Sequence, residues 1–325
     1  MSSVKYFLAA VVLSALAFAS QPPEALISAY SGKAVWNKGK SEMKFISSGT
    51  INLDRPNYRS HFWDVPEEVS RIVIGKNCIV TGAFRTSSDC TIEGRDRNTS
   101  IVYGTDQQKW ADSRGLKAYE YSQFQNRAGV LRVRNLTAVN PFAFFIRGWK
   151  NQCHAERCSF IDNRGGWGNH SDGFSGGHGS TIKDCYFETG DDAVKCYFDI
   201  EVSGVTIKMI QNCVPFQFGW NTYQDSVSRI KDVKILGDWG RGRARSVFQW
   251  KNGEDHKKVF IDGLRIFNPK ASLFELQSKG RLDIEIKNAF INLRRYGTKN
   301  FTGIRTICGS EEQKNLYVCP AARRK

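Results

Sequence analysis

The protein has 325 residues, of which 41% are hydrophobic and 24% are charged, so it has the length and the apolar content for a substantial core. The mean hydropathy is -0.42 and the only long apolar run lies at the N-terminus, which excludes a multi-pass membrane protein and a disordered chain. The net charge of +15 favours polyanionic partners such as acidic or sulfated glycans, nucleic acid or an anionic membrane; the alternative is that the basic side chains only keep the protein soluble.

Residues 1–20 are expected to be a secretory signal peptide. Lys5 precedes an apolar stretch from Tyr6 to Phe18, which is followed by small residues and then by Gln21. This order is typical of a cleavable signal, and the apolar run is too short for a membrane span. We therefore expect a secreted, extracellular protein that does not bind a membrane.

An oxidising compartment allows disulfide bonds among the nine cysteines, although one thiol must stay free and the connectivity cannot be read from the sequence. The pairs that are near in sequence are Cys78/Cys90, Cys153/Cys158, Cys185/Cys196 and Cys308/Cys319. None of the cysteines has zinc-site spacing, so a structural role is expected. Glycosylation sequons, which predict a glycoprotein, stand at Asn98, Asn135, Asn169 and Asn300.

A short β-type phrase recurs from residue 130 to residue 290. It reads VLRVRNLTAV at 130–139 and STIKDCYFET at 180–189, and successive phrases start 23 to 30 residues apart. Each phrase alternates apolar and polar residues and is bounded by Gly, Asn or Asp, which is typical of strands. Strands repeating at this spacing, with no helical pattern between them, predict an all-β parallel β-helix, a solenoid with about three strands per coil. A β-sandwich is the alternative, but the hairpin signals do not fall between matched strands.

The chain divides accordingly into four segments. Residues 1–20 are the signal peptide, 21–70 an N-terminal cap or lead-in, 71–307 the parallel β-helix domain, and 308–325 a C-terminal tail.

Three aspartates stand out between residues 167 and 197. Asp172 occurs in N-H-S-D-G, and Asp191 and Asp192 are adjacent in T-G-D-D-A-V-K, 19 and 20 residues later. Because about 20 residues make one turn of a solenoid, Asp172 and one member of the pair would lie on neighbouring coils, and the flanking glycines could supply the bulge that aims all three at one cleft. The alternative is that these aspartates are turn residues only.

Clustered carboxylates suit the hydrolysis of a glycosidic bond. One carboxyl must be held protonated, by burial and by like-charged neighbours, so that it can protonate the leaving oxygen. Another must be ionised to activate a water, and in inverting enzymes the two groups stand about 6.5–9.5 Å apart.

These motifs resemble the clan of right-handed β-helix glycoside hydrolases that joins polygalacturonases with dextranases and isopullulanase, and they are most similar to glycoside hydrolase family 49. The run from His170 to Gly173 is similar to the H-T-D-G of that family, and the run from Asp191 to Tyr197 is similar to its D-D-A-I-K-x-Y. C-Y-F at 185–187 and F-G-W at 218–220 are similar to its C-F-F and M-G-W, so that the resemblance covers roughly residues 130–250.

The resemblance implies that Asp191 is the general acid and that Asp172 and Asp192 together activate water, with inversion at the anomeric carbon. It also implies an α-glucan substrate such as dextran, and no metal or organic cofactor.

The sequence departs from the clan at three points. The G-H-G that follows the D-D pair in polygalacturonases is absent, since Gly177-His178-Gly179 precedes the pair, and their R-I-K is only echoed by Arg229-Ile230-Lys231. Residues 21–70 are too short for the N-terminal β-sandwich of family 49.

Substrate contacts are expected from Lys195, Trp220, Trp167, His170 and His178. The tryptophans could stack on sugar rings, the lysine could bind a hydroxyl or lower a neighbouring pKa, and the histidines could tune the acids. The alternatives are packing for the rings, as also for Trp239 and Trp250, a solvated lysine, and structural histidines. Arg241, Arg243 and Arg245 could bind anionic groups or form a flexible basic loop. Asn169 is expected to be unmodified, because a glycan there would block the cleft.

The leading hypothesis is a secreted, monomeric, inverting endo-glycoside hydrolase that is dextranase-like, uses an Asp triad and acts on a polysaccharide, with no nucleic-acid partner. The charge of +15 favours an anionic polymer instead, a uronan or sulfated galactan, and this alternative stays open. Two further hypotheses also stay open: a calcium-dependent lyase with Lys195 as the base, and a non-catalytic glycan-binding β-helix.

Overall fold

The computed structural model describes residues 20–55, 58–165, 168–237, 246–295 and 304–309. The expected signal peptide, apart from Ser20, and residues 310–325 of the expected tail lie outside the described residues. Within the described part of the chain, no helix is both long enough and apolar enough to cross a membrane.

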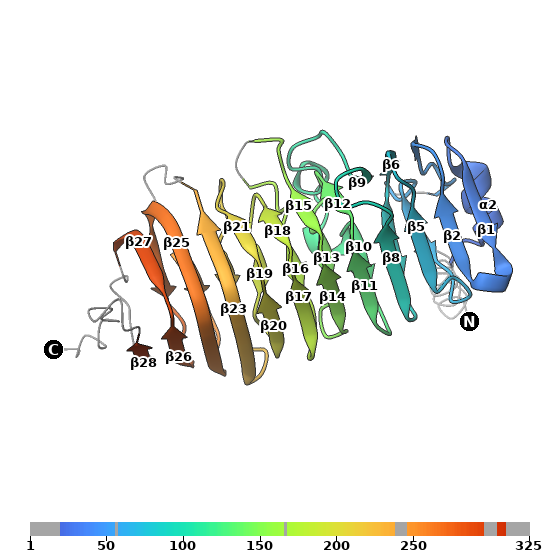
Figure 1. The fold of residues 1–325 in the computed structure, drawn as a ribbon. Helices are drawn as coiled ribbons and strands as arrows, with labels where there is room; N and C mark the ends of the chain where they lie inside the picture. Colours follow the sequence, from blue (N-terminus) through green and yellow to red (C-terminus); the bar gives the residue numbers. More distant parts are fainter. Residues whose placement is uncertain (1–19, 56–57, 166–167, 238–245, 296–303, 310–325) are drawn as a thin grey trace, which may run out of the picture.

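The chain winds into a right-handed parallel β-helix, which confirms the all-β solenoid predicted from the repeats. The coils follow one another from the N-terminal end, where helix α2 lies, to the C-terminal end at β27 and β28 (Figure 1). Each coil contributes strands to three parallel sheets that run the length of the molecule, here called sheets 1, 2 and 3. A strand in one coil pairs with the strand at the same place in the next coil, so the coils are held together by backbone hydrogen bonds along all three sheets.

Sheet 1 consists of β2 (Glu42–Phe45), β5 (Arg71–Ile74), β8 (Cys90–Gly94), β11 (Leu131–Arg134), β14 (Cys153–Glu156), β17 (Ser180–Lys183), β20 (Ile200–Ser203), the first parts of β23 (Ser226–Leu236) and β25 (His256–Leu276), β26 (Arg281–Lys287) and β28 (Ile304–Gly309). Sheet 2 consists of β3 (Gly49–Thr50), β6 (Cys78–Thr81), β9 (Ser100–Tyr103), β12 (Thr137–Val139), β15 (Ser159–Ile161), β18 (Tyr186–Glu188), β21 (Thr206–Lys208), later parts of β23 and β25, and β27 (Phe290–Arg295). Sheet 3 consists of β4 (Phe62–Val65), β7 (Ala83–Thr86), β10 (Phe124–Asn126), β13 (Ile146–Arg147), β16 (Phe174–Ser175), β19 (Val194–Lys195), β22 (Phe216–Gln217), β24 (Ser246–Trp250) and the last part of β25.

The core consists of apolar side chains stacked from coil to coil. Alternate residues of each strand point inward, as in β11, where Leu131 and Val133 are buried while Arg132 is exposed. In sheet 3 the inward position is phenylalanine in most coils, and the stacked rings of Phe216 and Phe248 lie 5.4 Å apart. Burial of such a ring contributes about 1.5–3 kcal/mol, and ring contacts add about 0.5–1.5 kcal/mol.

Each repeated phrase alternates apolar and polar residues throughout, as one long strand would. The structure bends the phrase in the middle, so that its first half lies in sheet 1 and its second half lies in sheet 2. At the bend from sheet 1 to sheet 2 one residue has a positive φ, and the residue after it packs inside. The residues at these bends are Asn135, Arg157, Asp184, Gly204, Asp232, Gly263 and Asn288. Asn, Asp and Gly tolerate the left-handed conformation best, and one of them turns the chain into the next sheet in every phrase except the one with Arg157.

The N-terminal end of the solenoid is covered by α2 (Pro23–Ala29), by β1 (Ala34–Asn37) and by the 3-10 turn η1 (Lys38–Lys40). Proline at the first position starts the helix, and Leu26 is fully buried beneath it. β1 pairs antiparallel with β2, so the first parallel strand is not an open edge. Whether residues 21–70 form a cap separate from the β-helix stays a prediction, since β2, β3 and β4 already pair with the strands that follow.

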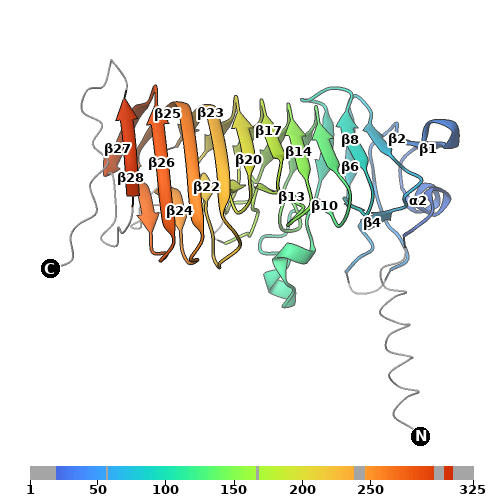
Figure 2. The same ribbon diagram turned by 90° about the horizontal axis from the view of Figure 1, so that it is seen from below.

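A segment of residues 104–123 leaves the solenoid between β9 and β10. It contains the 3-10 turns η2 (Asp112–Arg114) and η3 (Ala118–Glu120) and projects from the side of the molecule beside β10 and β13 (Figure 2). Trp110 and Tyr121 anchor it in a second apolar cluster with Phe62 and Phe142. This insertion therefore forms a wall beside sheet 3.

The disulfide expectation is wrong for the three near pairs that the structure describes. Seven cysteines are buried as free thiols, and they are Cys78, Cys90, Cys153, Cys158, Cys185, Cys196 and Cys213. In Cys153/Cys158, for example, the strand β14 separates the two residues, and at about 3.3 Å per extended residue the chain carries them beyond disulfide reach. The side chain of Cys308 and all of Cys319 lie outside the described residues.

Candidate active site

Asp172 and Asp192 lie side by side on neighbouring coils at the start of two sheet 3 strands. They are the residues two before Phe174 and Val194, which are partners in the parallel register of β16 and β19. The ladder extends to the aspartates, because the Gly173 N–H donates to the carbonyl of Asp192 at 2.8 Å. The separation of 20 residues therefore corresponds to one coil, as the sequence predicts.

Asp191 points into the same place from the turn before β19. The three carboxyl groups each place one oxygen within 4.8 Å of the others, and all three side chains are at most 8% exposed. Oδ1 of Asp191 accepts a hydrogen bond from the Asn212 side chain at 2.9 Å and from the Asp192 N–H at 3.0 Å. Adjacent residues inside a strand point to opposite sides of the sheet. Asp191 and Asp192 lie in a turn instead, so both side chains can face the same cleft.

The glycines at the site are required by close packing between coils and not by a positive φ. A Cβ on Gly173 would lie 2.3 Å from the Ala193 carbonyl oxygen, and a Cβ on Gly190 would lie 2.5 Å from Oε1 of Gln211. Gly190 N–H also donates to Oγ of Ser171 at 2.8 Å. These contacts bring the turn with Asp191 against the strand entry with Asp172.

Lys195 supplies the positive charge among the acids. Its Nζ lies 2.5 Å from Oδ1 of Asp172 and 2.9 Å from Oδ2 of Asp192, and it is 6% exposed. Burial lowers the lysine pKa, but the facing carboxylates outweigh burial and hold the pKa well above its usual value. The ammonium group is therefore charged, and it bridges two of the three carboxylates.

The carboxyl groups of Asp191 and Asp172 differ in their tendency to ionise. Burial and the neighbouring charges of Asp172 and Asp192 raise the pKa of Asp191 well above its usual value. Burial raises the pKa of Asp172 to about 6, against the opposing effect of Lys195. Asp191 is consequently the carboxyl favoured to hold a proton, while the contact with Lys195 favours the ionised form of Asp172.

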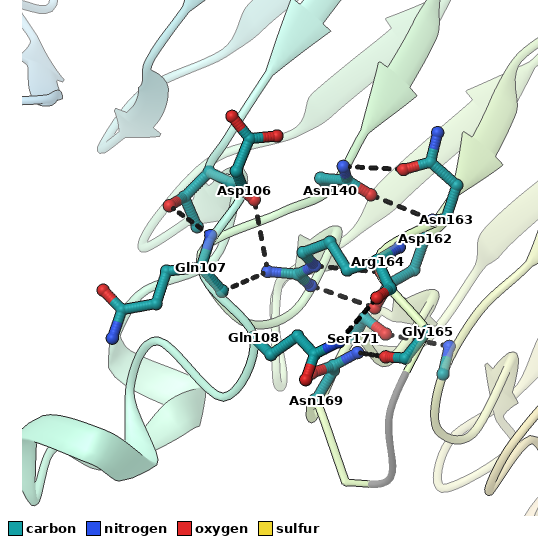
Figure 3. Close-up of polar contacts among 12 residues, drawn as sticks. Asp106, Gln107, Gln108, Asn140, Asp162, Asn163, Arg164, Gly165, Asn169 and Ser171 are labelled. Atoms are coloured by element: carbon teal, nitrogen blue, oxygen red, sulfur yellow. Dashed lines mark hydrogen bonds and ion pairs between the residues drawn. The ribbon is translucent and has the colours of Figure 1, made fainter.

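The loop that leads into Asp172 is fixed by a buried ion pair. Asp162 and Arg164 form two parallel contacts of 2.9 Å, and their side chains are at most 2% exposed. Arg164 also donates to the carbonyl of Gln107 at 3.1 Å, and Gln108 donates back to the carbonyl of Arg164 at 2.6 Å (Figure 3). The loop and the 104–123 insertion are thus joined, and the position of Asp172 depends on both.

The acids line a cleft of about 720 Å³ between sheet 3 and the insertion. The other residues of its lining are Asp112, Leu116, Lys117, Ala118, Tyr119, Phe144, Arg147, Trp149, His170, Ser175, Lys195, Tyr197, Trp220, Asn221 and Tyr223. Trp220 is 48% exposed, and its Nε1 lies 3.4 Å from Oδ2 of Asp192. A cleft rich in aromatic rings around a few acids suits a sugar chain, whose rings stack on aromatic faces.

Not all of the expected contact residues line the cleft. Lys195, Trp220 and His170 do, and Nδ1 of His170 is 2.9 Å from a carboxylate oxygen of Asp112. His178 does not: its ring pairs with Asp199 at 2.9 Å and packs edge-on against Phe198. The structure therefore places His178 outside the cleft, in a hydrogen bond with Asp199.

Several expected contacts lie outside the described residues, namely Trp167, Trp239, Arg241, Arg243 and Arg245. Trp250 is described and is buried in the core, 1% exposed, where it packs against Phe218.

Sequence reasoning missed the floor of the cleft. Tyr197 and Tyr223 stack face to face with ring centres 4.3 Å apart. They are held from the next coil, where Asp255 accepts from the Tyr223 N–H at 2.9 Å and the fully buried Lys257 donates to the Tyr197 carbonyl at 2.9 Å. The motif D-D-A-V-K-C-Y includes Tyr197, but nothing in the sequence places Tyr223 opposite it.

The three aspartates are also the one group within the described residues with the geometry of metal ligands. Calcium takes six to eight oxygen ligands. Here the Lys195 ammonium already contacts Asp172 and Asp192, so the fixed cation of the site is a lysine and the carboxylates fit a metal poorly.

Comparison with known proteins supports the fold. No family model and no curated protein matches the sequence. Among solved structures, the chain is similar to Dex49A from Penicillium minioluteum, a dextranase of glycoside hydrolase family 49, with a TM-score of 0.52 and 12% identity over 81% of this chain and 59% of that chain. It is also similar to a pectin methylesterase solved with a hexasaccharide, with a TM-score of 0.36 and 9% identity over 75% of this chain and 84% of that chain, which is too low to carry an argument.

The right-handed parallel β-helix is therefore shared with Dex49A, which supports the resemblance inferred from the motifs. The chain spans about 59% of the length of Dex49A. At this identity the likeness shows the fold alone.

Proposed function

We propose that the protein is a secreted endo-glycoside hydrolase that cleaves a polysaccharide in the cleft of sheet 3. The observation that carries the proposal is one buried cluster of three carboxyls in which Lys195 bridges Asp172 and Asp192, while burial and the neighbouring charges raise the pKa of Asp191. Pairs of acids whose environments separate their pKa values supply the proton donor and the base of glycosidic hydrolysis.

In this mechanism Asp191 gives its proton to the glycosidic oxygen as that bond breaks. Asp172 and Asp192 take a proton from a water molecule, whose oxygen forms the new bond to the anomeric carbon. Lys195 contacts both carboxylates, and its charge lowers the pKa of Asp172 against the effect of burial. One water is consumed, and a proton returns to Asp191 before the next cycle.

Inversion is the expected stereochemical course. The nearest oxygens of the three groups lie within 4.8 Å, which is shorter than the separation of about 6.5–9.5 Å between acid and base in most inverting enzymes. Both candidate bases, however, are bound to Lys195, which lowers their nucleophilicity and leaves them suited to holding a water between them. Proton NMR of the first product decides the matter: an inverted anomer supports the assignment, and a retained anomer contradicts it.

The endo mode is supported by the length of sheet 3. Strands β7 and β10 continue the sheet on one side of the acids, and β22 and β24 continue it on the other. A polymer can therefore follow the sheet past the acids in both directions.

The test uses wild-type protein, Asp191→Asn and the control Glu201→Gln, whose side chain is exposed on sheet 1 away from the cleft. The substrates are dextran, pullulan, polygalacturonate and a sulfated galactan, with products read as reducing ends and as ultraviolet absorbance, with and without a chelator. We expect reducing ends without absorbance, no effect of the chelator, and a loss of about 10²–10⁴-fold in kcat for Asp191→Asn only. Absorbing products that need calcium would assign a lyase, and an equally active Asp191→Asn would remove Asp191 as the acid.

A further inference from the structure

Arg147 lies in the cleft beside the acids. It is the outward residue of β13, it pairs in register with Ser175 of β16, and Lys195 takes the next place along the same row. With strands about 4.8 Å apart, Arg147 is about 10 Å from Lys195 along the cleft. A sugar next to the one being cleaved would reach it.

The guanidinium group of Arg147 is flanked by two aromatic rings, and none of the described acidic residues pairs with it. Its central carbon lies 4.9 Å from the ring centre of Tyr119 and 5.5 Å from that of Trp149. Among the described residues no carboxylate comes within ion-pair distance of Arg147, although Glu120 is near enough to influence it. Burial lowers its pKa, and the opposing effects of Tyr119, Glu120 and Tyr223 only partly offset burial.

The buried lysine of the cleft already has acidic partners. Lys195 contacts Asp172 and Asp192, and the ring of His170, which is partly exposed, forms a hydrogen bond with Asp112. Arg147 therefore offers planar donors to a ligand, and a guanidinium group held by flanking rings is well suited to bind a carboxylate or sulfate with two parallel hydrogen bonds. Lys117, on the insertion at the rim, adds a second positive charge on the same side.

We propose that Arg147 binds an anionic group of the polysaccharide, a carboxylate or a sulfate on a sugar beside the scissile bond, and that the substrate class is an acidic polysaccharide. This inference rests on the proposed function, because it assumes that the cleft holds a sugar chain. A neutral glucan would cover the guanidinium without giving it an anionic partner, which costs binding free energy.

The test compares polymers that differ only in charge: polygalacturonate with its carboxyl-reduced form, and a sulfated galactan with its desulfated form. Binding is measured by calorimetry with Asp191→Asn as the parent, so that hydrolysis does not consume the ligand. Arg147→Gln and Arg147→Lys are made in this parent. The matched control is Arg229→Gln, which removes an arginine stacked on Phe260 at 5.2 Å on sheet 1, outside the cleft.

We expect the parent to bind at least one acidic polymer more tightly than its neutral form. Arg147→Gln should weaken binding of that acidic polymer by about ten- to a hundred-fold and leave the neutral form unchanged. Arg147→Lys should lose less, because it keeps the charge but not the planar donors, and Arg229→Gln should bind like the parent. The polymer pair that shows the effect distinguishes carboxylate from sulfate.

Equal binding of charged and neutral forms, binding of neither acidic polymer, or an equal loss for both forms in Arg147→Gln would overturn the inference. Selective binding without any cleavage by the protein with Asp191 intact would support the inference and refute the proposed hydrolysis. Cleavage of dextran with no selectivity for charged polymers would support the proposed hydrolysis and refute the inference about Arg147.

Discussion

Lys195 places its positive charge unequally among the three aspartates. Its ammonium group contacts two of three buried carboxyls whose oxygens lie within 4.8 Å of one another, and its charge lowers the pKa of Asp172. Among the described residues, the side-chain carboxyl of Asp191 accepts hydrogen bonds from Asn212 and from the Asp192 N–H and from no cation. The asymmetry between acid and base therefore depends on which carboxyls the lysine reaches.

The pH dependence of activity follows from this arrangement. A base with a raised pKa works only above that pKa, so kcat/KM should fall as the pH drops through about 6, the value for Asp172. Because Lys195 lowers the pKa of Asp172, Lys195→Met should raise it further and move the acidic limb to higher pH, with a large loss of kcat. The midpoint of the acidic limb is a property of the coupled group of acids and is not the pKa of one residue.

The matched control is Lys208→Met, because Lys208 pairs with Glu188 at 2.8 Å on sheet 2, away from the cleft. Its pH profile should equal that of the wild type. If Lys195→Met is too slow for a profile, NMR titration of the carboxyl carbons measures the same shift. If Lys195→Met changes neither the acidic limb of the pH profile nor the carboxyl titrations, Lys195 does not control the pKa of the catalytic base.

The sequence predicted that Asp172 and one member of the Asp191-Asp192 pair lie on neighbouring coils, because about 20 residues make one coil, and it singled out Lys195 as a residue that could lower a neighbouring pKa. It was not sufficient for Arg147, Tyr119 or Tyr223. Coils vary in length, so the register partner of Arg147 cannot be counted from the sequence, and Tyr119 reaches the cleft because the 104–123 insertion lies beside sheet 3.

At the scale of elements, the loop before β16 contains a buried ion pair of its own. Its Asp162–Arg164 pair is almost fully inaccessible, and it joins the loop to the insertion (Figure 3). Removing one partner of a buried pair leaves an uncompensated charge, whereas removing both leaves none. The loop should therefore respond differently to single and double substitutions.

Arg164→Met should lower the free energy of unfolding by about 3–5 kcal/mol, because Asp162 would remain buried without its partner. The double variant Asp162→Asn, Arg164→Met should recover part of this loss. The control Arg281→Met removes an arginine from a pair with Asp283 in which the arginine side chain is 57% exposed, and should cost at most about 1 kcal/mol. Denaturant unfolding measures all three, and equal losses for Arg164→Met and Arg281→Met would contradict the prediction.

The bends between sheets 1 and 2 explain why the sequence shows the repeats but does not show that each repeat contains strands of two sheets. Both strands of a phrase alternate apolar and polar residues, and the inward residue after the bend, such as Leu136 or Val205, continues the pattern. Alternation alone thus indicates one long strand. The small polar residue between them, Asn135 in the first phrase, was the signal for the left-handed turn.

On the scale of the whole molecule, the cleft and the bends between sheets 1 and 2 lie on different sides of the solenoid. The cleft lies along sheet 3 and the insertion, whereas the bends from sheet 1 to sheet 2 lie on another edge of the solenoid. Modification of those bends would leave a polymer in the cleft unobstructed. The positions of the sequons can be judged against this division.

Asn98 and Asn169 should differ in glycosylation if the protein passes through a eukaryotic secretory pathway. Asn98 is exposed in the connection from β8 to β9, on the edge away from the cleft. Asn169 is 2% exposed, its Nδ2 donates to the Gly165 carbonyl at 2.7 Å, and its Oδ1 accepts from the Lys109 N–H at 3.0 Å. A glycan on that nitrogen would break the loop beside Asp172.

We therefore expect a glycan on Asn98 and none on Asn169 in protein secreted from eukaryotic cells. Enzymatic deglycosylation in heavy-oxygen water, followed by peptide mass spectrometry, labels each occupied asparagine. Asn98→Gln should lower the mass of the secreted protein by one glycan, and Asn169→Gln should leave the glycan mass unchanged while weakening the loop. A labelled Asn169 in folded protein would mean that the loop differs from this structure, because the nitrogen bonded to Gly165 would have to face solvent.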